Sequence, residues 1–297
     1  MATADSAAVF DTAFLSKLEQ LYLLAKKLFR GEHRAERRSR QTGSSLEFAD
    51  YRNYVGGDDL RTIDWNAYGR LDRLFIKLFE QEQDLHIYLL VDASASMRWS
   101  PAKLRQACRI AASLAYIGLV NLDRVNVHWF GADLGEDMGL TRGKSQFHKV
   151  LQFLREPPEL AGTTRLLETC RAFTKQARRR GLVYLLSDFF DPAGCEEALS
   201  LLRFAQFEVH LIQVLDPREL DPTDTGDLRL REDESGATMD LTADESLLRL
   251  YRQEVRAFLD KLAAFSVERG IGHLQTSTET PFEDLVLKVL RNGVLLR

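Results

Sequence analysis

Apolar residues recur at helical and strand spacings along most of the chain, and the two spacings alternate from residue 85 onward. An apolar stripe at three- and four-residue steps over residues 11–30, from Leu15 to Phe29, predicts an amphipathic helix. Nearly continuous apolar runs, typical of strands buried on both faces, lie at 86–91, 182–187 and 208–215. Helical patterns between and around them lie at 101–119, 146–155, 165–179 and 194–206.

This alternation predicts an α/β fold, with a central, mostly parallel, twisted sheet of about six strands and helices on both faces. The rest of the pattern gives an alternating strand at 124–130, a polar hairpin at 228–241, a helix at 244–269, a strand at 271–276 and a helix from 281 to about 290. We place this domain at residues 85–297. Residues 1–84 precede it as an N-terminal helix and a small β-rich collar, with a strand at 74–80.

The net charge of the chain limits the kinds of partner that we expect. The formal net charge of −4 gives no general reason to expect nucleic-acid or membrane-surface binding. The distribution is uneven, because residues 26–40 carry seven basic side chains and residues 216–245 carry eleven acidic ones against three arginines. Opposite charge in two segments suits docking between them or to a partner.

The three cysteines, Cys108, Cys170 and Cys195, form no CxxC pair, so we expect no disulfide framework and a reducing compartment. The first thirty residues show no secretory signal, and the longest near-apolar run, 110–120, is too short to cross a bilayer. We therefore expect a cytoplasmic protein with no direct membrane insertion.

Oxygen-bearing residues gather at the carboxyl ends of the predicted strands, where sheets of this kind bind ligands. Asp92, Ser94 and Ser96 come directly after the first apolar strand, and Asp188 comes after the second. Residues 162–164 precede a helix and offer another hydroxyl. Carboxylates and hydroxyls are hard ligands, so the pattern predicts a site for Mg²⁺ first, with Mn²⁺ or Ca²⁺ as alternatives.

A plainer alternative is that Asp92 and the two serines only cap the following helix. Ser100 fills that role better, because it directly precedes Pro101 at the predicted helix start. The coincidence of three segments at one sheet edge also favours the cation site.

The stretch DASASM at residues 92–97 is similar to the DxSxS motif of von Willebrand factor A domains. That resemblance implies a metal-ion-dependent adhesion site (MIDAS), completed by a threonine and by a later aspartate. The matching ligands here are Asp92, Ser94, Ser96, Thr164 and Asp188. Thr164 is preferred to Thr163 because Leu166 then has the family spacing, and Thr163 stands where the family has glycine.

Residues 52–70, RNYVGGDDLRTIDWNAYGR, resemble the signature of the DUF58 family, with the pattern R-x-Y-x-x-G-D-D-x-R-x-I-D-W. The resemblance runs from about residue 35 to the C-terminus. It implies an A-domain-like module in a bacterial or archaeal protein that serves a MoxR-type AAA+ ATPase as an adaptor or co-chaperone. Many relatives carry N-terminal transmembrane helices, and the lack of such a pattern here points to a soluble subtype.

These resemblances lead us to expect a metal-dependent protein–protein interaction module and not an enzyme. The bound ion would accept an acidic side chain from the MoxR-type ATPase or from its client protein, and no nucleic acid is expected. One alternative is a Mg²⁺-dependent phosphohydrolase using the same carboxylates, although no general acid or base is evident near them. Another is a vestigial site, with binding through the collar and the charged segments alone.

The remaining motifs predict structure rather than chemistry. Arginines, aspartates and aromatic residues alternate in 52–70, which indicates a hydrogen-bonded charge lattice in a folded collar; a partner-contact or nucleic-acid surface is the alternative. Gly143-Lys144-Ser145 is not a P-loop, because Met138 stands where that motif needs glycine. The histidines show no metal-binding spacing.

Overall fold

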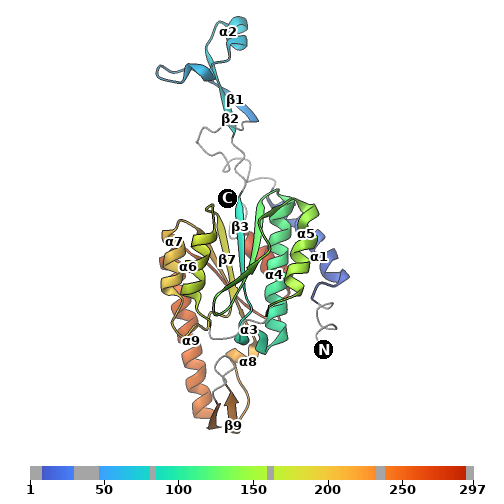
Figure 1. Ribbon diagram of the computed structural model, residues 1–297, viewed down its shortest axis with the longest axis vertical. Helices are drawn as coiled ribbons and strands as arrows, with labels where there is room; N and C mark the ends of the chain where they lie inside the picture. The colour runs from blue at the N-terminus through green and yellow to red at the C-terminus, as the bar shows by residue number, and fades with distance from the viewer. Residues whose placement is uncertain (1–8, 30–46, 81–84, 159–163, 232–237, 292–297) are drawn as a thin grey trace. The chain divides into compact units, whose positions relative to one another are not determined.

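The computed structural model describes residues 9–29, 47–80, 85–158, 164–231 and 238–291 (Figure 1). Its contacts divide the chain into two units. The sheet unit comprises the chain up to Ala25 together with Leu85–Leu295, and the hairpin unit comprises Lys26–Asp84 with the last two residues. The expected segment 1–84 is therefore divided, because the first helix packs on the sheet unit, where the Phe14 and Phe282 ring centroids are 4.8 Å apart.

The sheet unit is built on a seven-stranded sheet, in which five strands are parallel. Its parallel strands, in spatial order, are β11 (Gly272–Ser277), β8 (Glu208–Leu215), β7 (Leu182–Ser187), β3 (His86–Asp92) and β4 (Arg124–Phe130). β5 (Leu134–Asp137) and β6 (Thr141–Arg142) pair antiparallel with β4. These two short strands escaped the sequence pattern, but the mostly parallel sheet is confirmed.

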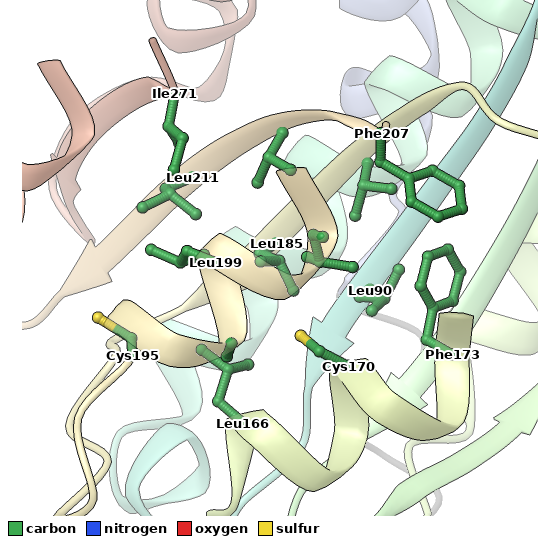
Figure 2. Packing of buried hydrophobic residues seen from close by; sticks show 14 of the residues in the cluster. Leu90, Leu166, Cys170, Phe173, Leu185, Cys195, Leu199, Phe207, Leu211 and Ile271 are labelled. Atoms are coloured by element: carbon green, nitrogen blue, oxygen red, sulfur yellow. The ribbon is translucent and has the colours of Figure 1, made fainter. Parts of the chain in front are cut away.

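Helices cover both faces of this sheet, as expected. The helices of the sheet unit are α1 (Thr12–Phe29), α3 (Ala95–Trp99), α4 (Pro101–Val120), α5 (Phe147–Arg155), α6 (Leu166–Gln176), α7 (Glu196–Phe204), α8 (Pro217–Leu220), α9 (Glu245–Glu268) and α10 (Phe282–Arg291). Figure 2 shows the face that packs against α6 and α7, where Leu90 and Leu185 meet Cys170 and Leu199. None of the described helices is long and apolar enough to span a membrane.

The opposite face lies against α4. Gly118 of α4 permits the close approach, because a Cβ at this position would lie 2.7 Å from Ile87 Cδ1 and 3.0 Å from Val125 Cγ2. α4 therefore runs directly over β3 and β4, and its N-terminal turn reaches the carboxyl ends of the strands. Strand order reverses at β3, since β4 follows it on one side and β7 on the other. Such a switch point is where an open α/β sheet binds its ligands.

The predicted hairpin at 228–241 is formed by β9 (Gly226–Arg231) and β10 (Thr238–Ala243), which pair antiparallel. Its expected turn at Ser235-Gly236 lies outside the described residues. Arg229 donates two hydrogen bonds to Asp240 across the two strands, from Nε to Oδ1 at 2.6 Å and from Nη2 to Oδ2 at 3.0 Å.

The hairpin unit pairs β1 (Glu47–Asn53) with β2 (Phe75–Glu80), and a short helix α2 (Trp65–Leu71) lies between them in the sequence. α2 begins at Asp64, whose Oδ1 accepts hydrogen bonds from the backbone nitrogens of Asn66 and Ala67. The Tyr51 hydroxyl donates to the other oxygen of Asp64 at 2.8 Å. The expected strand at 74–80 is confirmed, whereas α2 was not expected. The described residues show part of the expected hydrogen-bonded lattice, since Arg52 also donates to Asp58.

Candidate functional site

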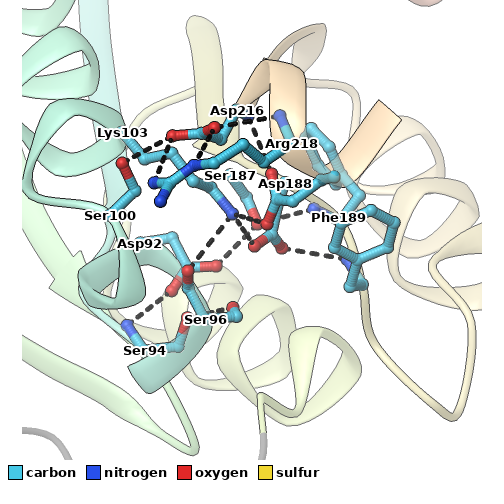
Figure 3. A network of polar contacts seen from close by, with 12 residues as sticks. Asp92, Ser94, Ser96, Ser100, Lys103, Ser187, Asp188, Phe189, Asp216 and Arg218 are labelled. Atoms are coloured by element: carbon cyan, nitrogen blue, oxygen red, sulfur yellow. Dashed lines mark hydrogen bonds and ion pairs between the residues drawn. The ribbon is translucent and has the colours of Figure 1, made fainter. Parts of the chain in front are cut away.

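Asp92 ends β3 at the switch point and is fully buried. Its Oδ1 accepts a hydrogen bond from the backbone nitrogen of Ser94 at 2.8 Å, and its Oδ2 accepts one from Ser187 Oγ at 2.6 Å (Figure 3). Because Ser187 ends the neighbouring strand β7, its hydrogen bond to Asp92 links the C-terminal ends of β3 and β7. Burial, followed by the charge of Asp188, raises the pKa of Asp92 from 3.8 to about 7.

Ser94 and Ser96 lie at the start of the short helix α3. Ser94 is at its N-cap, yet its side chain makes no capping hydrogen bond; its Oγ lies 3.0 Å from Ser96 Oγ instead. The two hydroxyl groups therefore face each other beside Asp92. The plainer prediction, in which these side chains serve as helix caps, is not what the structure shows for Ser94.

Ser100 does not cap α4 in the expected way. It occupies the N-cap position, but its side chain makes no capping bond and its Oγ donates to Asp216 Oδ2 at 2.7 Å. Asp216 caps α8 by accepting from the backbone nitrogen of Arg218, and the Arg218 guanidinium binds both oxygens of Asp216. The prediction of a side-chain cap at Ser100 was wrong because a long-range partner with a negative charge took its hydroxyl group.

Asp188 follows β7 and is paired with a lysine, Lys103, that was not among the predicted site residues. Asp188 Oδ2 accepts from Lys103 Nζ at 2.7 Å, and the exposed fractions of these side chains are 3% and 0%. Lys103 Nζ also donates to Glu219 Oε1 at 2.6 Å and to the backbone oxygen of Ser96 at 3.2 Å. The ammonium group thus links the predicted ligand segments to α8.

A signal for Lys103 was present in the sequence. Lys103 stands at helical spacing before Ala107, Ile110 and Leu114, which form a fully buried stripe of α4. A lysine within an apolar stripe requires a buried counter-charge. What the sequence could not supply was the identity of that counter-charge, because Asp188 and Glu219 are 85 and 116 residues away along the chain.

Opposing effects act on the ionisation of this cluster. Burial lowers the pKa of Lys103, but Asp188 and Glu219 outweigh it, so the pKa is raised and the ammonium stays charged. The pKa of Glu219 is raised, chiefly by burial, although Lys103 acts to lower it. Both shifts reflect a low-polarity environment in which charged groups depend on one another.

Thr164 lies at the same edge of the sheet and is 5% exposed. The next residue, Arg165, donates its backbone N–H to the oxygen of Gly131, directly after β4. Phe130 of β4 is in turn the register partner of Asp92. The network of Figure 3 joins Asp92, Ser94, Ser96 and Asp188, while Thr164 is placed near it by the backbone. Residues 162 and 163 lie outside the described part of the chain.

The donor set suits a hard divalent cation, since it consists of two carboxylates and two hydroxyl groups. No group of three or more His, Cys, Asp or Glu side chains among the described residues is arranged to hold a metal ion. In this arrangement Lys103 already neutralises part of the charge of Asp188. The position beside Asp188 Oδ2 is therefore taken by an ammonium group.

The acidic segment 216–245 finds its described partners nearby. Asp216 accepts from Ser100 and Glu219 accepts from Lys103, next to the strand-end cluster of Asp92, Ser94, Ser96, Lys103 and Asp188. Asp221 accepts from Arg252 Nε of α9 at 2.6 Å. Most of the basic stretch 26–40 lies outside the described residues, so the expected docking between the two segments stays a prediction.

The cysteines and histidines were expected to be structural. Cys108, Cys170 and Cys195 are free and buried, and burial raises the pKa of the Cys108 and Cys195 thiols to about 12. His86, His128 and His210 lie within strands and are buried.

The family described as "Protein of unknown function DUF58" matches residues 50–258, which is more than half of the chain. The chain belongs to the DUF58 family. The match spans the hairpin unit's signature and most of the sheet unit, so both parts belong to one family pattern. The resemblance expected from residues 52–70 is thereby confirmed.

Relatives of this DUF58 chain include proteins described as uncharacterized. Those of Mycobacterium bovis and Mycobacterium tuberculosis are 28% identical over 244 residues, which is 80% of this chain and 76% of each relative. A protein of Mycobacterium avium is 38% identical over 76 residues, covering 26% of this chain and 44% of that protein.

Solved structures similar to this chain include two proteins from Bacteroides. An aerotolerance-related membrane protein from Bacteroides fragilis has a TM-score of 0.47 and 15% identity, covering 71% of this chain and 98% of that chain. The conserved hypothetical protein BatB from Bacteroides thetaiotaomicron has a TM-score of 0.45 and 14% identity, covering 70% and 99%.

Proposed function

We propose that this DUF58 chain is a metal-dependent protein-interaction module, with a von Willebrand factor A-like sheet unit and a MIDAS-type cation site. The observation that carries the proposal is the convergence of Asp92, Ser94, Ser96 and Asp188 in one polar network at the switch point of the sheet. Thr164, at the same edge, is proposed as the fifth ligand.

The chemistry of this donor set favours binding over catalysis. Two carboxylates and neutral hydroxyl groups leave a divalent ion, Mg²⁺ first, with coordination positions for water or for another ligand. When bound, the ion would supply a positive centre that accepts an acidic side chain from another protein. The residues of this chain would hold and orient that ion. We propose a MoxR-type AAA+ ATPase, or its client, as the partner and a cytoplasmic adaptor or co-chaperone as the role.

The first test is calorimetric titration of Mg²⁺ into the wild-type chain and into Asp92→Ala. Loss of one of two carboxylates should weaken Mg²⁺ binding by at least about tenfold. Asp240→Ala is the matched control, because Asp240 is an exposed aspartate of the β9–β10 hairpin. Equal Mg²⁺ affinity in the folded Asp92→Ala and wild-type proteins would contradict the proposed site.

The second test uses the purified MoxR-type ATPase of the same organism, with Mg²⁺ or with EDTA. Binding that requires Mg²⁺ and is lost in Asp92→Ala supports the adaptor role. Binding that is insensitive to EDTA supports the vestigial-site alternative, with contact through other surfaces. Hydrolysis of a generic phosphoester that disappears in Asp92→Asn would replace the proposal with the phosphohydrolase alternative.

A further inference from the structure

Lys103 is a fully buried basic side chain at the strand-end cluster. Its side chain is 0% exposed, and its Nζ contacts Asp188 Oδ2, Glu219 Oε1 and the backbone oxygen of Ser96 (Figure 3). An ammonium group has three N–H donors, and each has an acceptor here. Two of the three acceptors belong to the segments that carry the predicted metal ligands. Lys103 therefore lies within the site and not beside it.

The single positive charge of Lys103 is shared between two carboxylates. Asp188 and Glu219 share one ammonium group, while the hydrogen bonds of Asp92 come from the neutral donors Ser94 N and Ser187 Oγ. Of these three carboxyl groups, Asp188 and Glu219 contact the ammonium group directly. A divalent ion bound by Asp92 and Asp188 would neutralise the remaining negative charge of the carboxylates. It would also share Asp188 with Lys103, and two cations at one carboxylate repel each other.

Glu219 is fixed in its position from several directions. Its Oε2 accepts from the backbone nitrogen of Asp216 at 2.8 Å, which completes the capping box of α8. The Tyr251 hydroxyl of α9 donates to the backbone oxygen of Glu219 at 2.9 Å. Ser100, at the start of α4, holds Asp216. Lys103 is consequently held between Asp188 and an anchored carboxylate on α8.

We propose that Lys103 is the resident cation of the strand-end site. Its ammonium group competes with the divalent ion for Asp188, and Glu219 provides the counter-charge that receives Lys103 when the ion binds. This inference rests on the proposed function, because it concerns the same ion. It adds that the metal affinity of the chain is set by Lys103 as well as by the oxygen ligands.

The test is calorimetric titration of Mg²⁺ and Mn²⁺ into the wild-type chain, Lys103→Met and Lys103→Gln. Removing the competing charge should tighten binding of both ions by at least about tenfold in each variant. Lys261→Met and Lys261→Gln are the matched controls, since Lys261 forms an exposed ion pair with Glu196 on the surface. These controls should keep the wild-type affinity.

The outcomes separate this inference from the proposed function. Wild-type binding that is unchanged in both folded Lys103 variants overturns the inference and leaves the proposed function in place. Binding in the Lys103 variants but not in the wild type supports the inference and contradicts a metal-dependent wild-type function. Binding in none of these proteins overturns both.

A measurement on the wild-type chain decides the matter if neither variant folds. Reductive methylation followed by mass spectrometry reports how accessible each lysine is. In EDTA, Lys103 should be protected relative to Lys261, and saturating Mg²⁺ should increase its modification at least about fivefold. Protection that does not change with Mg²⁺, in a protein that binds the ion, overturns the inference.

Discussion

The strand-end cluster and the hairpin unit both place aspartates next to basic side chains, but in different surroundings. Asp188 and Lys103 have side chains exposed by only 3% and 0%. In the hairpin unit, Arg52 Nη2 donates to Asp58 Oδ1 at 2.9 Å, and the exposed fractions of Arg52 and Asp58 are 46% and 24%. A pair of an aspartate and a basic residue is thus removed from solvent in one unit and exposed to it in the other.

The ionisation of the aspartates follows this difference. Burial raises the pKa of Asp92, whereas the backbone N–H of Val55, and then Arg52, lower the pKa of Asp58. Exposed ion pairs are screened by water and salt and contribute little to stability. Buried charges instead depend strongly on their partners. The comparison teaches that burial, more than composition, decides whether a charged side chain depends on its partner or is screened by solvent.

The largest effect should come from breaking the buried pair. Lys103→Met leaves Asp188 and Glu219 without their shared cation, and loss of one partner of a buried ion pair costs about 3–5 kcal/mol of unfolding free energy. Urea unfolding in EDTA, followed by circular dichroism, measures this change. Lys261→Met, which breaks an exposed pair, should differ from the wild type by less than the error of the measurement. Equal losses in the two variants would remove the distinction between buried and exposed pairs.

The second prediction concerns the pH dependence of the metal-free protein. The pKa of Asp92 is about 7 in the folded chain against an ordinary value of 3.8, so the folded state binds its proton more tightly. The corresponding stabilisation is complete below about pH 4 and is lost as pH rises to about 7, by on the order of 4 kcal/mol. Asp92→Asn cannot ionise, so its unfolding free energy should lack this loss.

Urea unfolding in EDTA at several values between pH 4 and pH 8 checks this prediction. Asp240→Asn, at an exposed position, should follow the wild-type profile. Parallel profiles for the wild type and Asp92→Asn would show that Asp92 ionises normally despite its burial.

The smallest effects should come from the hairpin unit. Asp64→Ala removes the N-cap of α2, which should cost about 1 kcal/mol of local stability. Hydrogen exchange of the α2 amides measures the loss. Arg52→Ala removes only the exposed partner of Asp58 and should change exchange less than Asp64→Ala does. A larger effect of Arg52→Ala would show that the guanidinium group, and not the aspartate caps, holds this unit together.

Much of the fold could be predicted because its elements have clear local patterns. The buried strands and the helices α4 to α7 and α9 lie within a few residues of their expected ranges. β5 and β6 could not be predicted, since strands of four and two residues with polar side chains leave no periodic pattern. α2 and α3 were missed for a related reason, because each is only a turn or two long.

The candidate site was only partly visible in the sequence. Asp92, Ser94 and Ser96 stand within five residues, so a strand that ends before them brings them to one edge without further information. Asp188 could be added because a second apolar strand ends just before it. Ser187 was not among the predicted site residues, although its hydroxyl group donates a hydrogen bond to Asp92.

The sequence by itself determined the parallel sheet, its carboxyl edge and the hard oxygen donors that gather there, because strand burial and strand ends are local properties of the pattern. Only the tertiary structure decided which charges meet at that edge. Lys103 comes from the first turn of α4, and Glu219 comes from α8, 116 residues later. Periodicity shows that a residue is buried but not what it is buried against. That partner depends on how α4 and the segment after β8 pack over the ends of the strands.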